Sequence, residues 1–193
     1  MSYEGVAAYI EPDDFQMVID NLEGTKHAVR NRCILLLGYF TGTRVGTMAQ
    51  LTLADMLNKD GSLKQVVNLR SKTVKRNKKG YRIFLAREEV RKGILDYLKV
   101  RPESNTNSLF VSRKGGAFTP DTLQKLIYRL FDESGLDGAS SHSLRRSFAS
   151  NALHSGADIG TLQTLMAHEN INTTQRYIHT DDRMLADVVR NIL

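Results

Sequence analysis

Five residues of this chain have the types and spacing needed to break a phosphodiester bond. Tyr177 lies nine residues after His168, His142 and Arg145 lie three residues apart, and Arg44 stands far upstream. Arginine holds an anionic phosphate through a planar fork of charged donors, and histidine accepts a proton near neutral pH. A tyrosine hydroxyl with a base beside it is a nucleophile. On a basic chain, these groups could cleave DNA without a metal ion.

The charge of the chain favours an anionic partner. It has 27 lysines and arginines against 21 acidic residues, a formal net charge of +6. No acidic residue lies between Ser62 and Arg87. Like charges repel unless a polyanion neutralises them, so we expect a DNA-contacting hairpin here rather than a solvated tip. Its basic residues are Arg70, Lys72, Lys75, Arg76, Lys78, Lys79 and Arg82.

Composition bounds the class of protein. With 193 residues, 41% hydrophobic and 25% charged, the chain fits one large soluble domain. The single cysteine, Cys33, excludes an internal disulfide framework and lies in an apolar run, so we expect a buried core thiol. That run is too short to span a bilayer, and no signal peptide is visible, so we expect a cytoplasmic protein without membrane contact. No histidine–carboxylate cluster has metal-ligand spacing, and we expect neither metal nor cofactor.

Apolar residues recur at helical spacing along most of the chain. A central helix is expected from about Ala28 to Phe40, and short helices at residues 159–167 and 173–178. Pro12 and Thr119-Pro120 suit helix starts. The apolar stripes are Phe15, Val18, Ile19 and Leu22; Val90, Ile94, Leu95 and Leu98; Leu123, Leu126, Ile127, Leu130 and Phe131; Leu144, Phe148, Ala152 and Leu153; and Leu185, Val188, Val189 and Ile192.

A smaller part of the chain has strand character. Gln65–Leu69 and Tyr81–Leu85 are expected to pair, with Leu109–Val111 as a third strand. Arg101–Ser108 is expected to be an exposed loop. Gly115-Gly116 indicates a turn and not a phosphate loop, because no lysine–serine/threonine pair follows it. The predicted fold class is therefore mainly α with a small antiparallel β-sheet (α+β).

Five fragments, in this order, resemble the motifs of the tyrosine recombinases, also called phage integrases. The resemblance extends from about Pro12 to the end, and the histidine–tyrosine spacing makes it specific. It implies a catalytic domain over residues 12–180, an extension over residues 1–11 and a C-terminal helix over residues 181–193. The fragments are Thr41-Gly42-Thr43-Arg44, Ser71-Lys72-Thr73, His142-Ser143-Leu144-Arg145-Arg146-Ser147-Phe148-Ala149, Leu165-Met166-Ala167-His168 and Thr173-Thr174-Gln175-Arg176-Tyr177.

The resemblance implies a role for each catalytic residue. Arg44 and Arg145 resemble the two arginines that clamp the scissile phosphate, and Tyr177 resembles the nucleophile. His142 matches the histidine expected to act as base. Its spacing of three residues from Arg145 places both on one helix face. The neighbouring Arg146 is the rival phosphate ligand, and that spacing favours Arg145.

Two further residues complete the implied site. Lys72 matches the hairpin lysine that protonates the departing 5′ oxygen, and Lys75 competes with it for this role. His168 matches the second histidine, which hydrogen-bonds the phosphate or steadies the tyrosine. The product would be a 3′-phosphotyrosyl link and a free 5′ hydroxyl. His27, His154 and His179 are expected to be structural or solvent-facing.

The chain departs from the family pattern at two places. The family commonly has an acidic residue three positions after its first arginine, where this chain has Thr47, so other groups are expected to hold Arg44. Most members also carry an N-terminal helical domain, whereas only Met1–Glu11 precedes the first expected helix. The chain is therefore either a catalytic fragment of a longer enzyme or a naturally short recombinase.

The implied activity is site-specific recombination of double-stranded DNA by integration, excision or inversion. We expect a homo-tetramer on DNA, with the C-terminal helix docked on a neighbouring protomer, and a monomer when free. Two alternatives stay open. One is a type IB topoisomerase, which uses similar chemistry to relax supercoils. The other is a DNA-binding protein that keeps the phosphate pocket without turnover.

Overall fold

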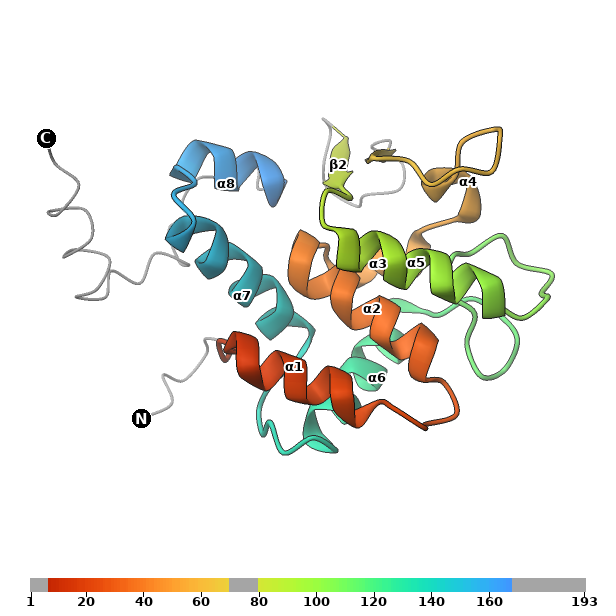
Figure 1. The fold of residues 1–193 in the computed structure, drawn as a ribbon, viewed down its shortest axis with the longest axis horizontal. Helices are drawn as coiled ribbons and strands as arrows, with labels where there is room; N and C mark the ends of the chain where they lie inside the picture. The colour runs from red at the N-terminus through yellow and green to blue at the C-terminus, as the bar shows by residue number, and fades with distance from the viewer. Residues whose placement is uncertain (1–6, 70–79, 168–193) are drawn as a thin grey trace, which may run out of the picture.

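The described part of the protein is a helical domain with one pair of strands. The structure, a computed structural model, describes residues 7–69 and 80–167. Figure 1 shows the elements: α1 (Pro12–Asn21), α2 (Ala28–Thr41), α3 (Val45–Gln50), α4 (Leu53–Met56), β1 (Val66–Leu69), β2 (Tyr81–Phe84), α5 (Glu88–Val100), α6 (Pro120–Asp132), α7 (Ser141–His154) and α8 (Ile159–Leu165). The predicted α+β class is confirmed.

Most predicted helices form where the periodicity places them. Pro12 and Pro120 occupy the first turns of α1 and α6, where the missing amide hydrogen costs nothing. The hydroxyl of Thr119 accepts from the amide of Thr122 and caps α6. All five apolar residues of the α6 stripe are buried. The helices expected at residues 173–178 and 181–193 lie outside the described residues.

The stripe predicted for α5 is wrong at Leu95, which is 42% exposed. The buried face of this helix consists of Val90, Gly93, Ile94 and Tyr97. Leu95 is turned about 100° from Ile94 around the helix axis and leaves that face. Gly93 belongs to it because α2 packs closely there, and a Cβ atom would lie 2.8 Å from Leu36 Cδ1.

The predicted strand pair is confirmed, and the third strand is wrong. β1 and β2 are antiparallel, with Val67 opposite Ile83. Leu109–Val111 is buried but makes only isolated bridges. Its amides have unrelated partners, since Leu109 N donates to the carbonyl of Leu51 and Val111 N donates to the hydroxyl of Tyr97. A ladder cannot form from such scattered bonds.

Helix α2 is the centre of the core. It lies between α1 and α5 in Figure 1 and packs against α5 and α7. The ring of Tyr39 stacks on Phe15 of α1 with 3.9 Å between centroids. Cys33 is buried as predicted, and burial raises the pKa of its thiol. No helix within residues 7–69 and 80–167 is long and apolar enough to cross a membrane.

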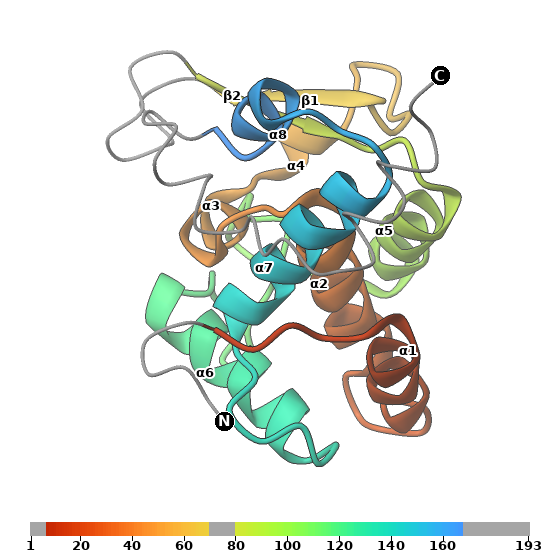
Figure 2. The same ribbon diagram turned by 90° about the vertical axis from the view of Figure 1, so that its left-hand side faces the viewer.

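The arrangement of α7, α8 and the strand pair determines which segments lie close together. Helix α8 and the strand pair lie at the same end of the molecule, at the top of Figures 1 and 2. Helix α7 leads up to α8, so its last turns approach that end. The chain that enters α1 crosses α7 in Figure 2.

Candidate active site

A fixed turn between α2 and α3 positions Arg44. Gly42 ends α2 in the left-handed conformation, with φ of 61°, which favours glycine. The buried hydroxyl of Thr41 donates to the carbonyl of Leu37 at 2.5 Å and lies 2.6 Å from the hydroxyl of Thr43. These bonds set the direction of the chain at Arg44, which directly precedes α3 and is half-buried.

The first turns of α7 carry the histidine and the second arginine. The hydroxyl of Ser143 accepts from the amide of Ser140 at 3.1 Å, which pairs an otherwise open donor at the start of the helix. His142 is exposed, whereas Arg145 is only 7% exposed. The histidine is therefore open to solvent one turn from a buried guanidinium.

Main-chain carbonyls bring the two arginines together. Arg145 donates through Nη1 to the carbonyl of Gly42 and through Nη2 to that of Met166, the latter at 2.5 Å. Arg44 donates through Nη2 to the carbonyl of Ala167 at 3.2 Å. The turn after α2, the start of α7 and the end of α8 thus meet at two positive charges.

The backbone beyond α8 has an uncommon conformation at this meeting point. Ala167 has φ of 46°, and among residues 7–69 and 80–167 it is the one non-glycine residue with positive φ. An alanine there is strained by about 1–2 kcal/mol. Such strain gathers at functional sites, and here it turns the Ala167 carbonyl toward Arg44.

Several predicted residues lie outside the described part of the chain, and their roles stay predictions. His168 follows Ala167 directly in the sequence, and Tyr177 lies nine residues further on. The hairpin residues outside the description are Arg70, Lys72, Lys75, Arg76, Lys78 and Lys79.

The structure shows the surroundings of Arg146 and Thr47, the two positions at which the sequence left a question open. Arg146, the rival of Arg145, donates through Nη1 to the carbonyl of Ala7 and not to the group of carbonyls at the end of α8. Of these two arginines, Arg145 is the one that donates to the end of α8, where Arg44 also donates. Thr47, which stands where an acidic residue is common, is buried, and the carbonyl of Ala167 is a partner of the Arg44 guanidinium.

Arg82 is the basic hairpin residue within the described part. It lies on the exposed face of β2, opposite Asn68 of β1. Its guanidinium carbon lies 5.3 Å from the centroid of the Phe84 ring, which is itself 38% exposed. This face presents a positive charge above the strand pair.

The other described histidines, His27 and His154, lie apart from Arg44 and Arg145. His27 precedes α2, and desolvation, followed by the charge of Arg30, lowers its pKa. His154 is exposed in the last turn of α7. Within residues 7–69 and 80–167, no three histidine, cysteine, aspartate or glutamate side chains gather to hold a metal ion.

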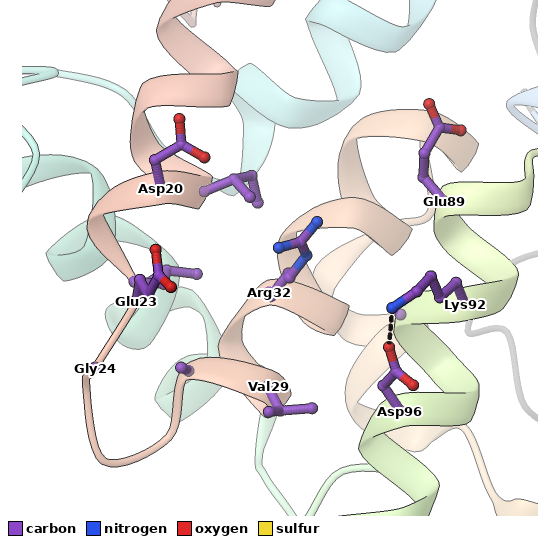
Figure 3. Close-up of a pocket in the computed structure, with 12 residues that line it drawn as sticks. Asp20, Glu23, Gly24, Val29, Arg32, Glu89, Lys92 and Asp96 are labelled. Carbon is purple, nitrogen blue, oxygen red and sulfur yellow. Dashed lines mark hydrogen bonds and ion pairs between the residues drawn. The ribbon is translucent and has the colours of Figure 1, made fainter.

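A cavity of about 380 Å³ lies between α1, α2 and α5 (Figure 3). Arg32 projects into it, and the ion pair of Lys92 and Asp96, 2.6 Å long, lies on its α5 side. The lining comes from the first turns of α2, whereas Arg44 follows its last turn, about 20 Å away along the helix. This cavity is separate from Arg44 and Arg145.

The carbonyls of Gly42, Met166 and Ala167 were missed by sequence analysis, because a motif names side chains and these partners are main-chain atoms. Of these three carbonyls, only that of Gly42 could have been anticipated from the sequence. A glycine directly after a predicted helix favours a left-handed end, which turns the following carbonyl away from the helix.

Comparison with known proteins gives recombinases and integrases as relatives. The tyrosine recombinase XerC of Actinobacillus succinogenes is 34% identical over 184 residues, which cover 93% of this chain and 59% of that protein. The crystal structure of XerA recombinase superposes with a TM-score of 0.78 at 26% identity, covering 95% of this chain and 64% of that one. The Tn1549 transposon integrase, solved in complex with transposon right end DNA, gives a TM-score of 0.77 at 20% identity, over 95% of this chain and 66% of that one. The last likeness shows the fold alone.

This chain spans about three fifths of the length of that XerC relative. The model of the phage integrase family matches residues 8–184, which include both arginines, both histidines and the tyrosine. The chain therefore belongs to the phage integrase family, as its motifs predicted.

Proposed function

We propose that this chain is a site-specific DNA recombinase that cuts and rejoins DNA through a 3′-phosphotyrosyl intermediate. The observation that carries the proposal is the convergence of Arg44 and Arg145 at the end of α8, with His142 exposed one turn from Arg145. The XerC and XerA relatives, which are recombinases by name, support it.

The arginines would bind the scissile phosphate. A guanidinium has five N–H groups, so its bond to Ala167 leaves Arg44 with others for phosphate oxygens. The two carbonyl bonds of Arg145 fix the plane of its fork. Negative charge that gathers on the nonbridging oxygens during attack would then meet two permanent positive charges already in place.

The remaining groups would move protons. The Tyr177 oxygen attacks phosphorus while His142 accepts its proton, and the bond from phosphorus to the 5′ oxygen breaks. Lys72, or Lys75 in its place, gives a proton to that oxygen. His168 would bind the phosphate or steady Tyr177. Rejoining reverses these steps, and because the phosphotyrosyl bond keeps the energy of the phosphodiester, no ATP is needed.

The basic hairpin would hold the DNA backbone. Arg82, on the exposed face of β2, would belong to this surface, and the Tn1549 integrase, which shares the fold, was solved in complex with DNA. Each neutralised phosphate releases counterions, so binding would weaken steeply with salt. The assigned contacts are Arg70, Lys75, Arg76, Lys78, Lys79 and Arg82.

On DNA the protein would act as a homo-tetramer. The apolar stripe of residues 185–192 must be buried to be stable, and a neighbouring protomer offers a surface. Removing the chain after Asp182 should therefore lower the tetramer fraction on DNA, measured by sedimentation, more than it lowers binding to a single site. Normal tetramers would refute this assembly.

The test of the function is trapping of the covalent intermediate. Duplexes tiled over the DNA that flanks the gene, each with a nick beside a phosphate, are incubated with protein and resolved under denaturing conditions. We expect a covalent adduct with wild type and none with Tyr177→Phe, which keeps the ring and loses the nucleophilic oxygen. Tyr128→Phe, at an exposed tyrosine of α6, is the matched control and should retain the adduct.

The same experiment separates the alternatives. A protein without turnover would bind the duplexes and give no adduct. A type IB topoisomerase would form adducts at many sequences and relax supercoiled plasmid without a defined site. An adduct that persists in Tyr177→Phe would remove Tyr177 from the nucleophile role.

A further inference from the structure

Residues Ala7–Ile10, here called the entry strap, cross α7 before the chain enters α1 (Figure 2). The hydroxyl of Tyr9 donates to Asn151 Oδ1 at 2.6 Å, and the amide of Ile10 donates to Ser147 Oγ at 2.8 Å. Arg146 donates to the carbonyl of Ala7. Three side chains of α7, those of Arg146, Ser147 and Asn151, thus bind one short segment that lies some 140 positions away in the sequence.

The entry strap is also fixed to the centre of the core. Ile10 is 2% exposed, and its carbonyl accepts from the hydroxyl of Tyr39 in α2 at 3.3 Å. Asn151 Nδ2 donates to the same Tyr39 oxygen at 3.2 Å. The strap, α2 and α7 therefore share one hydrogen-bonded network around the Tyr39 hydroxyl.

The two bonds made by the Ile10 main chain, to Ser147 and to Tyr39, are buried, and the two bonds of the Asn151 side chain are partly buried, so loss of the network would be costly. Ser147 has no exposed surface, and the bond from Ile10 is buried with it. A buried donor or acceptor without a partner costs about 1–3 kcal/mol. Water cannot readily replace the strap at Ser147, which makes the strap a structural part of the α7 environment.

The strap and the arginine site lie on opposite sides of α7. Ser147 follows Arg145 by two residues, about 200° around the helix axis, and Asn151 lies one turn beyond Ser147 on the same side. On the other side, Arg145 is bonded to the carbonyls of Gly42 and Met166. Helix α7 is clamped between these two sets of bonds.

We propose that the entry strap orients α7 and that Tyr9, Arg146 and Ser147 are positioning residues for Arg145. The proposal rests on the recombinase function proposed above. A shift of about 1 Å in a group that binds the reacting phosphate can slow a reaction by about 10²-fold. A loosened strap would therefore slow cleavage while the DNA-binding surface stays in place.

Tyr9→Phe tests the proposal with a matched control elsewhere in the core. The variant removes one hydroxyl and leaves Asn151 Oδ1 without its bond from the strap. Tyr97→Phe removes the hydroxyl of a buried tyrosine in α5, which accepts from Val111 N at 3.0 Å. We expect single-turnover cleavage of the nicked duplex to slow about tenfold in Tyr9→Phe and little in Tyr97→Phe. DNA affinity should change less than about twofold in both.

Two more measurements separate positioning from general loss of stability. Hydrogen exchange of the amides of residues 142–148 in the free protein should be faster in Tyr9→Phe than in Tyr97→Phe. In an Arg145→Lys background, Tyr9→Phe should slow cleavage much less than in wild type, because the strap acts through Arg145. Arg146→Lys, which keeps a donor for the Ala7 carbonyl, should retain more activity than Arg146→Ala.

Any of three results would overturn the proposal: equal cleavage rates in Tyr9→Phe and Tyr97→Phe, unchanged exchange in α7, or a full additional loss in the Arg145→Lys background. If wild type formed no covalent adduct, the recombinase function would fail instead. The exchange comparison would still decide whether the strap holds α7.

Discussion

Arg145 and Arg146 are neighbours on α7, and they make the same kind of hydrogen bond to different parts of the protein. Both side chains donate to main-chain carbonyls. Arg145 binds the turn after α2 and the end of α8, where Arg44 also donates a bond, and His142 is exposed one turn away on α7. Arg146 binds the entry strap on the other side. Residue type alone does not distinguish the two arginines, whereas the segment that each one contacts does.

The largest expected effect tests the two arginines against each other. Arg145→Lys should slow single-turnover cleavage by about 10²–10³-fold, because a lysine cannot hold two carbonyls and present a directed fork to phosphate. Arg146→Lys keeps one donor and should cost less than about fivefold, in line with the net 1 kcal/mol of one hydrogen bond. Equal losses in the two variants would abolish the distinction between the faces.

On the site side, Gly42 should be irreplaceable. Its φ is 61°, and a Cβ atom would lie 2.4 Å from Phe148 Cδ1. Gly42→Ala should lower the free energy of unfolding by about 2–4 kcal/mol, from the left-handed backbone and the crowding of α7. Gly46→Ala is the control, since Gly46 lies in α3 with nothing near its Cβ position, and it should gain about 0.5–1 kcal/mol. Urea unfolding of both variants measures this, and equal values would contradict it.

A structural feature of this domain could be predicted from the sequence when the residues that cause it lie within one short segment. Helix α6 was predictable because its five apolar residues and its Thr119 cap lie within one segment. Leu95 was misplaced because the phase of α5 depends on Gly93, whose lack of a side chain matters only beside α2. Leu109–Val111 was mistaken for a strand because burial is predictable from apolar residues, whereas the partners of their amides are not.

The site divides in the same way. The motifs singled out Arg44 and Arg145, and the structure brings both side chains to the end of α8. The carbonyls that hold the arginines are main-chain atoms brought together by tertiary packing. The entry strap had no signal at all, since Tyr9 and Asn151 are ordinary polar residues until the fold places them 2.6 Å apart.

On the strap side, the buried hydroxyl of Ser147 should contribute to stability. Ser147→Ala leaves the buried amide of Ile10 without a partner and should lower the free energy of unfolding by about 1–3 kcal/mol. Ser155→Ala is the control on the same helix, because that hydroxyl is exposed and donates within its own last turn. It should change stability by less than about 0.5 kcal/mol. Indistinguishable unfolding curves for the two variants would mean that the strap contributes little to α7.

The smallest expected effect concerns pH and the Tyr9 hydroxyl. Burial, followed by the neighbouring Tyr39 and Glu11, raises the pKa of Tyr9 from 10.0 to about 12. Because the folded protein holds this proton more tightly than the unfolded chain, its contribution to stability is complete below pH 10 and is lost between pH 10 and about 12. Tyr39, whose pKa burial also raises, is present in both wild type and Tyr9→Phe, so their difference isolates Tyr9. The stability advantage of wild type over Tyr9→Phe should therefore shrink as pH rises through this window, measured by urea unfolding at pH 9, 10 and 11. An advantage that stays constant would mean that the hydroxyl is not held by the strap network in solution.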